Sequence, residues 1–259
     1  MKTIQPAMFL VMIMSILMEC KKDYPISNAD PFTSVTAADA KLDWTVLDKW
    51  IKPEHFVEGI NNEFLPMVPG DTAFFTTVSV ENGETIVEDV YVAVTHDIKV
   101  IQGISCEVIH DVVMEDGIIT EDTYDWFAQD IKGNVFYFGE DTKKLQEDGS
   151  WDTEGSFEAG VDGAEAGIVM AFNPKKVVGM EYRQEYYVGH AQDKAKVTAT
   201  NETVTIAYGT FKHCVKTEET TVLDPGVIEY KWYAPGIGLV MASISIGGDE
   251  HEELIGMVP

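Results

Sequence analysis

The stretch YDWFAQDIKGNVFYFGED, from Tyr124 to Asp141, decides the fold. Two aromatic-rich runs flank Lys132-Gly133, and Asp130 and Asn134 stand on either side of this pair. A short glycine-containing turn between two such runs is typical of a β-hairpin. The chain is therefore expected to consist of antiparallel strands, with this hairpin as its most informative part.

The register of this hairpin predicts a charged pair. A turn with an even number of residues pairs Asp130 with Val135 and places Asp125 directly opposite Glu140. Like charges that face each other across a ladder are destabilising, so a cation, a basic side chain such as Arg183, or water must compensate them. In this register one face carries Tyr124, Trp126, Ala128, Val135 and Tyr137, and the other carries Asp125, Phe127, Gln129, Phe136, Phe138 and Glu140.

Length and charge limit the classes of function. The chain has 259 residues, enough for one large β domain, and carries 44 acidic against 18 basic residues, for a net charge of −26. Such a charge repels nucleic acid and anionic membrane surfaces, because phosphate binding requires Lys and Arg. It favours divalent cations or basic partners, and it also fits acidic faces that only keep a secreted protein soluble.

Residues 1–19 are expected to form a signal peptide. Lys2 is followed by the nearly unbroken apolar run from Ala7 to Met18, which has the length of a signal h-region and is short for a transmembrane helix. Leu17-Met18-Glu19-Cys20 resembles a bacterial lipoprotein box, although Met18 and Glu19 depart from the small residues usual there. The sequence predicts export, with Cys20 as the lipidated residue on the outer or cytoplasmic membrane, or else secretion.

The remaining chain reads as a tether followed by one domain. Residues 20–35 are polar and contain two prolines, and a helical pattern runs from Thr36 to Ile51 before Pro53. After Gly70 alternating strands joined by short turns predominate, which requires antiparallel neighbours. Residues 36–259 are thus expected to form a single all-β domain with minor α content. Its antiparallel meander would make a curved half-barrel, a barrel or a sandwich, with the N-terminal helix packed on it.

Cys106 and Cys214 lie in apolar strand-like runs. Two thiols in an exported protein either form one disulfide or remain small buried hydrophobic side chains, and the sequence leaves both open. Neither belongs to a C-x-x-C motif, which disfavours zinc and redox chemistry.

Catalytic signatures are absent from the sequence, including the nucleophile elbow, H-E-x-x-H and the Walker A loop. The six histidines lack metal-binding spacing. Carboxylates and glycines are concentrated in residues 148–167, a composition suited to a hard cation such as Ca²⁺. The predicted metal ligands are Asp125, Glu140, Glu158 and Asp162.

Other polar and aromatic residues are candidates for ligand contact. Aromatic side chains of the central hairpin could stack on a ligand, although aromatics on a strand more often pack in a sheet face. Arg183 and Glu185 are expected on one strand face, where Arg183 competes with a cation as the counter-charge of Asp125 and Glu140. The predicted binding residues are Trp126, Asp130, Tyr137, Arg183 and Glu185.

Five segments resemble a family of exported bacterial proteins, many with lipoprotein-type signals, for which no activity is established. The sequence YKWYAPGIGLV also resembles the last strands of periplasmic lipoproteins that bind lipids or lipopeptides and have a curved sheet covered by helices. The first resemblance implies export and no functional residues; the second implies a lipid-binding sheet. The five segments are Asn62–Gly70, Asp125–Asp141, Gly155–Ile168, Tyr182–Gly189 and Tyr230–Val240.

The sequence therefore predicts a non-catalytic binding protein of the cell envelope, or a secreted one, that binds a divalent cation through acidic loops. Two alternatives remain at this point. A periplasmic carrier of a hydrophobic ligand needs a continuous apolar concavity, and an extracellular hydrolase needs two carboxylates across an open cleft.

Overall fold

The computed structural model describes residues 44–81 and 83–259. These residues are mostly antiparallel β-structure, and none of their helices is long and apolar enough to span a membrane. The predicted signal peptide, the tether and Cys20 lie outside the described residues. The elements are α1 (Trp44–Trp50), two 3₁₀ helices (Pro53–His55 and Pro174–Lys176) and the strands β1 (Phe56–Val57), β2 (Ile60–Asn61), β3 (Pro66–Met67), β4 (Thr72–Glu81), β5 (Glu84–Ile101), β6 (Ile104–Glu115), β7 (Ile118–Asp130), β8 (Val135–Leu145), β9 (Trp151–Asp152), β10 (Phe157–Glu158), β11 (Glu165–Met170), β12 (Glu181–Arg183), β13 (Glu185–Tyr186), β14 (Asp193–Ile206), β15 (Gly209–Thr221), β16 (Ile228–Ala234), β17 (Gly238–Ile246) and β18 (His251–Val258).

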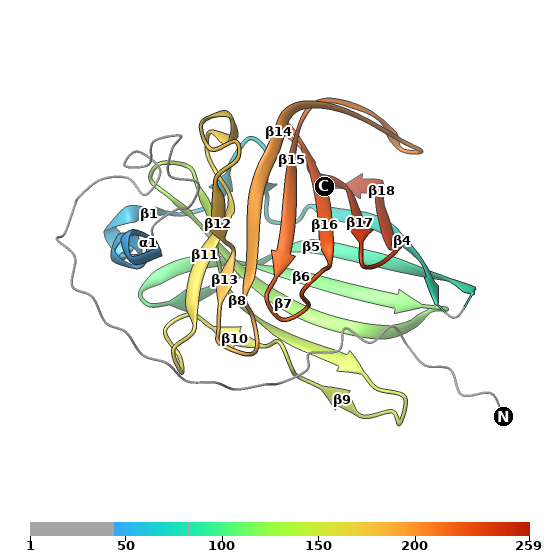
Figure 1. Cartoon of the computed structure of the whole chain (residues 1–259). Coiled ribbons are helices and arrows are strands. Elements are labelled where there is room, and N and C mark those ends of the chain that lie inside the picture. Colours follow the sequence, from blue (N-terminus) through green and yellow to red (C-terminus); the bar gives the residue numbers. More distant parts are fainter. Residues whose placement is uncertain (1–43, 82) are drawn as a thin grey trace.

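One large antiparallel sheet forms the molecule and curls until its edges meet. Its strand order is β12-β14-β15-β16-β17-β18-β4-β5-β6-β7-β8-β11-β13. The last strand of the sequence, β18, therefore lies beside β4, the first long strand of the sequence. The two ends of this order, β12 and β13, are separated in sequence by Gln184 alone. In Figure 1 the strands β14 to β17 run across the direction of β5 to β7, and β11 to β13 lie together near α1. Of the three predicted architectures, the structure forms a nearly closed barrel-shaped sheet.

The closing of the sheet depends on a glycine. A Cβ at Gly167 in β11 would lie 2.4 Å from the carbonyl carbon of Gln184 and 2.5 Å from the carbonyl oxygen of Arg183. Only a residue without a side chain allows two backbones to approach so closely. Gly167 thus lets β11 pass against the link between β12 and β13.

Arg183, the only arginine of the chain, fixes this closure. Its side chain is buried, and its Nε and Nη2 atoms donate hydrogen bonds to the carbonyl oxygen of Ala166 at 3.1 and 2.9 Å. It also forms ion pairs with Asp48 of α1 and Glu165 of β11. A planar guanidinium can serve a carbonyl and two carboxylates at once, which an ammonium cannot do with the same geometry. One side chain therefore joins α1, β11 and β12.

The predicted helix packs on the sheet as expected. Its described part is α1, whose Leu47 and Trp50 are buried in the main hydrophobic cluster with strand residues such as Phe136 and Phe138. Trp50 also donates a hydrogen bond from Nε1 to Asp130 Oδ2 at 2.9 Å. The remainder of the predicted helix, from Thr36, lies outside the described residues.

The central hairpin is confirmed as β7 and β8, although its register starts differently. Gln129, rather than Asp130, lies opposite Val135. The backbone N–H of Asp130 donates a hydrogen bond to the carbonyl oxygen of Asn134 at 2.9 Å, and this bond closes a turn with an odd number of residues.

A bulge in this hairpin then restores the predicted charged pair. The pairing shifts between Trp126 and Phe127, so that Asp125 does lie opposite Glu140. The same shift brings Tyr137 opposite Phe127, and the two rings stack with centroids 4.8 Å apart. The predicted placement of Tyr137 on the face of Trp126 is therefore wrong.

The acidic region before residue 167 is rich in loops and turns. It also contains the two-residue strands β9 and β10 and the start of β11, all of which pair with β8 or β13. Glycine and acidic residues disfavour strands locally, and these short strands form because β8 offers them an edge.

Both cysteines are free and fully buried, in different hydrophobic clusters. Of the two alternatives for Cys106 and Cys214, the disulfide is wrong. Burial raises the pKa of the Cys106 thiol to about 12, as expected for an inert core residue.

Replacing the closing glycine tests this account of the fold. We expect Gly167→Ala to lower the free energy of unfolding by about 3 kcal/mol or more, because the added Cβ forces the β11 backbone away from Gln184. The matched control is Gly256→Ala in β18, where the added Cβ would meet only Phe74 at 3.8 Å. Chemical denaturation of both variants measures the difference. Equal stabilities would show that the closure does not require glycine.

Candidate binding site

The inner face of β6 to β8 is lined with polar side chains that share one side of the pleat. Cross-strand pairing places Thr123 opposite Thr142 and Asp125 opposite Glu140, and Asp111 of β6 lies opposite Thr123. The charge of Glu252 in β18 acts on Asp111, although β4 and β5 lie between their strands in the sheet. The two side chains therefore face each other across the inside of the curved sheet.

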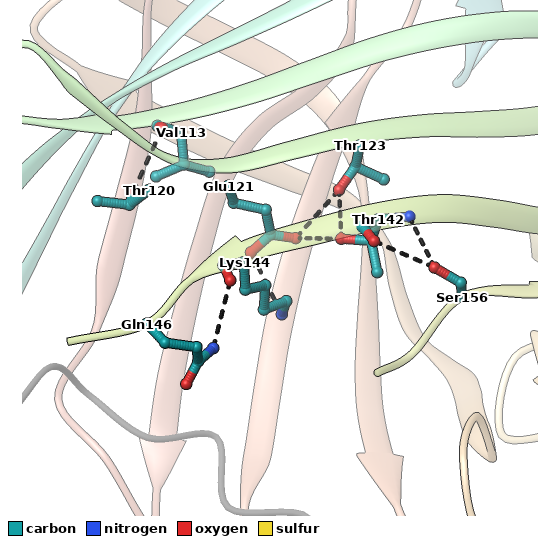
Figure 2. A network of polar contacts seen from close by, with 8 residues as sticks. All are labelled: Val113, Thr120, Glu121, Thr123, Thr142, Lys144, Gln146 and Ser156. Atoms are coloured by element: carbon teal, nitrogen blue, oxygen red, sulfur yellow. Dashed lines mark hydrogen bonds and ion pairs between the residues drawn. The ribbon is translucent and has the colours of Figure 1, made fainter. Parts of the chain in front are cut away.

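One end of this face is satisfied by the chain itself, as Figure 2 shows. Glu121 Oε1 accepts hydrogen bonds from the hydroxyls of Thr123 at 3.2 Å and Thr142 at 3.3 Å. The other oxygen of Glu121 lies 3.2 Å from Lys144 Nζ, and the two threonine hydroxyls are 2.6 Å apart. Glu121 thus has both a counter-charge and hydrogen-bond donors.

The next pair along the strands, Asp125 and Glu140, forms no ion pair with a basic side chain of the described residues. Lys144, which already pairs with Glu121, offsets the charge of Glu140 only in part. Asp125 accepts a hydrogen bond of 2.6 Å from the hydroxyl of Tyr137, which is its strongest polar contact. Burial raises the pKa of Asp125 to about 7 despite this bond. Burial, followed by the charge of Asp125, raises the pKa of Glu140 to about 8. Two carboxyls that face each other in a protein interior resist ionising together.

Asp111 extends the group onto β6. Burial raises its pKa well above the usual range, and the charges of Asp125, Glu252 and Glu140 raise it further. Its Oδ1 atom is buried and has no hydrogen-bond partner among the described residues. Buried polar atoms without a partner are uncommon in folded proteins, so this oxygen marks a place where the chain alone does not complete the interactions.

The opposite wall contains the same kind of pair with a lysine added. Glu219 of β15 lies opposite Glu229 of β16, and Lys231 Nζ lies 3.1 Å from the first carboxylate and 3.2 Å from the second. Burial alone would lower the pKa of Lys231, but the charges of Glu219 and Glu229 raise it well above its usual range. This pair is therefore an internal salt bridge.

Glu185 of β13 and Asp193 of β14 connect these two groups of carboxyls. Burial raises the pKa of Glu185 well above its usual range, and the charges of Asp193, Glu140 and Asp125 raise it further, while Lys231 lowers it. The electrostatic neighbours thus run around the whole inside of the sheet. We call this set the acidic ring: Asp111, Asp125, Glu140, Glu185, Asp193, Glu219, Glu229 and Glu252, with Lys231 as its cation.

The carboxyls of the ring differ in exposure, and Asp193 is exposed. Asp125, Glu140 and Glu185 each keep part of their surface accessible, although the sheet surrounds them on several sides. One lysine cannot neutralise so many carboxyls, so the ring attracts positive charge or retains protons.

Two predicted metal ligands lie elsewhere. Glu158 pairs with Gly139 rather than joining Glu140 on its face, and it forms a 2.8 Å ion pair with Lys99. Asp162 lies beyond it in the turn before β11, at a positive φ of 49°. The structure brings together Asp125 and Glu140 only. Within the described part of the chain, no three His, Cys, Asp or Glu side chains converge as metal ligands.

Two of the predicted binding residues, Trp126 and Asp130, contact other parts of the fold and stabilise it. Trp126 lies on the face of β7 opposite to Asp125 and packs under Lys99, whose Nζ is 3.3 Å from its ring centroid. Asp130 is fully buried and accepts hydrogen bonds from Trp50, from the backbone of Lys132 and from Asn134. These contacts hold the turn of the central hairpin against α1.

The remaining predicted binding residues divide between two places. Tyr137 and Glu185 belong to the acidic ring or contact it. Arg183 pairs with Asp48 and Glu165, so the prediction that it compensates Asp125 or Glu140 is wrong. Arg183 and Glu185 are separated by the link at Gln184, where one strand ends and another begins, so they do not act on one charge cluster.

No protein-family model and no curated protein matches this chain. Two solved structures resemble it in fold. One is a protein of Bacteroides fragilis described as exported, with a YmcC-like fold; it is 15% identical, with a TM-score of 0.45, over 77% of this chain and 100% of that one. The other is described as a lipoprotein of Parabacteroides distasonis; it is 13% identical, with a TM-score of 0.46, over 76% and 99% of the two chains.

The raised pKa values make stability depend on pH. The folded pKa of Glu140 lies above its unfolded value, so the fold penalises the ionised form. The penalty is absent below about pH 4 and grows as the pH rises toward 8. We expect Glu140→Gln to be more stable than the unmodified protein by about 2–4 kcal/mol at pH 8 and nearly equal to it at pH 4.

Chemical denaturation across this pH range measures the effect. The control is Asp141→Asn, the exposed neighbour on the same strand, which should change stability by less than about 0.5 kcal/mol. A destabilised Glu140→Gln at pH 8 would contradict the assignment of Glu140 to an uncompensated pair.

Proposed function

We propose that this protein is an exported, non-catalytic binding protein that holds a cationic ligand inside its barrel-shaped sheet. The observation that carries the proposal is the pair of carboxyls Asp125 and Glu140, which face each other and form no ion pair with a basic side chain of the described residues. A bound cation would lower the pKa of both groups and remove the penalty of their repulsion. Binding and stability are therefore coupled at this pair.

The export part of the proposal rests on the sequence of residues 1–20, with Cys20 as the residue that would anchor the protein to a bacterial membrane. A net charge of −26 supports a cation over an anion or a nucleic acid as the ligand. The position inside the sheet differs from the predicted acidic loops, since Glu158 of β10 and Asp162 of the following turn do not join Asp125 and Glu140.

The alternative of a hydrophobic-ligand carrier has less support from the inner face. Such a carrier needs a largely apolar cavity with few polar groups. The inner face does carry apolar residues, for example Phe75, Val90 and Leu254, but these pack together as a buried cluster.

Thermal unfolding at pH 8 tests the proposed function. A ligand at a hundred times its dissociation constant stabilises the native state by about 2.7 kcal/mol, which corresponds to a rise of about 5–10 °C in Tm for a chain of this size. We expect such a rise with a cation from a panel that includes calcium chloride and organic amines, measured against chelator alone. Asp125→Asn should abolish the rise.

The matched control for this experiment is Glu158→Gln, which removes a carboxylate outside the ring. It should keep the full rise in Tm. If no cation raises Tm, or if both variants respond alike, the interior of the sheet does not bind cations and the proposal fails.

A further inference from the structure

We infer that the ligand of the acidic ring is an organic polyammonium, a flexible methylene chain that carries two or more ammonium groups. This inference rests on the proposed function and names its ligand class. Three features of the described residues carry it: a lysine that already binds one carboxyl pair of the ring, an unpartnered oxygen, and the spread of the carboxyls around the sheet.

The first feature is a comparison within the ring. Glu219 and Glu229 face each other across neighbouring strands, as Asp125 and Glu140 do. The first pair receives the alkylammonium group of Lys231, with contacts of 3.1 and 3.2 Å. The pair Asp125 and Glu140 has the same cross-strand arrangement, but no ammonium of the described residues bridges it, because Lys144 is paired with Glu121. A primary ammonium of a ligand would form with Asp125 and Glu140 the ion pairs that Lys231 forms with Glu219 and Glu229.

The second feature is the buried Oδ1 atom of Asp111, which has no hydrogen-bond partner in the described part of the chain. Asp111 faces Asp125, Glu140 and Glu252, and none of these can donate a hydrogen bond when ionised. An ammonium group carries three donors and no acceptor. One such group beside Asp125 could therefore also serve Asp111, after a small rotation of that carboxyl.

The third feature is the distribution of charge. The carboxyls of the ring come from strands on all sides of the sheet, from β6 to β18. Calcium requires several oxygens within about 2.3–2.6 Å of one point, and no such convergence exists among the described residues. Positive charges separated by a flexible chain match separated carboxyls better than one point charge does.

The walls beside the pair suit the carbon chain of such a ligand. Tyr137 stacks on Phe127 directly next to Asp125, with ring centroids 4.8 Å apart. Aromatic surfaces accept methylene groups, and their faces attract ammonium groups. Ile109, opposite Asp125 in the sheet, adds an apolar surface on the other side.

Isothermal titration calorimetry of the purified protein with spermidine at pH 8 tests the inference. We expect saturable binding with one spermidine per chain, and at least about tenfold weaker binding by Asp125→Asn and by Asp111→Asn, because each substitution removes a charged hydrogen-bond acceptor. The control variant Glu158→Gln should bind as the unmodified protein does. Parallel titrations use calcium chloride and n-butylamine.

The outcomes separate this inference from the proposed function. Binding of calcium without spermidine would overturn the polyammonium and leave a cation-binding protein. Butylamine that binds as tightly as spermidine would overturn the need for several ammonium groups. Equal spermidine binding by Asp125→Asn and Glu158→Gln would show attraction to the acidic surface alone. Binding of none of the three probes would overturn both proposals.

Discussion

The closure of the sheet around Arg183 is the interaction on which the rest of the structure depends. This buried guanidinium joins β12 to β11 through the carbonyl oxygen of Ala166, and it reaches α1 through Asp48. A buried charge with one partner removed costs several kcal/mol, about 3–5 in comparable cases. Arg183 is nevertheless satisfied on every side, because the two carboxylates and the carbonyl converge on it. Gly167 allows the backbones to come close enough for this arrangement.

Because the sheet closes, one of its faces points inward, and this inner face carries an unusual number of carboxyls. Side chains that would be solvated on an open sheet face one another in an enclosed space, so their pKa values rise, as for Asp125, Glu140 and Glu252. A core of this kind is less stable at neutral pH than an apolar one would be. Such a loss of stability is a common property of binding sites, where groups await a ligand that compensates them.

Much of the fold could be predicted from the sequence, because local patterns determine it. Period-2 alternation and short turns predicted the antiparallel strands after Gly70, and the aromatic runs around Lys132-Gly133 predicted the central hairpin. The pairing of β18 with β4 could not be predicted, since no local pattern specifies contacts between distant strands. The bulge after Trp126, which moves Tyr137 to the other face, has no clear sequence signal either.

The candidate site was predictable only in part, for the same reason. The facing of Asp125 and Glu140 follows from the register of one hairpin, and the sequence predicted it. Glu229 alternates with apolar residues in its strand, whereas Asp111 and Glu252 each follow a histidine, and an ordinary solvated sheet face shares both patterns. Only the closure of the sheet turns that face inward. The single arginine was assigned to the wrong carboxylates, because its partners Asp48 and Glu165 are distant in sequence.

The central claim is that Asp125 and Glu140, two carboxyls of the acidic ring, form no ion pair with the described residues that would compensate their charges. Carbon-13 NMR titration of the side-chain carboxyl groups of Asp125 and Glu140 in ligand-free protein measures this directly. The account predicts apparent pKa values near 7 and 8 for this coupled pair, and a fall of both when a polyammonium ligand is added. Values near 4 for both carboxyls in the ligand-free protein would contradict it, since they would show that solvent already stabilises the two charges.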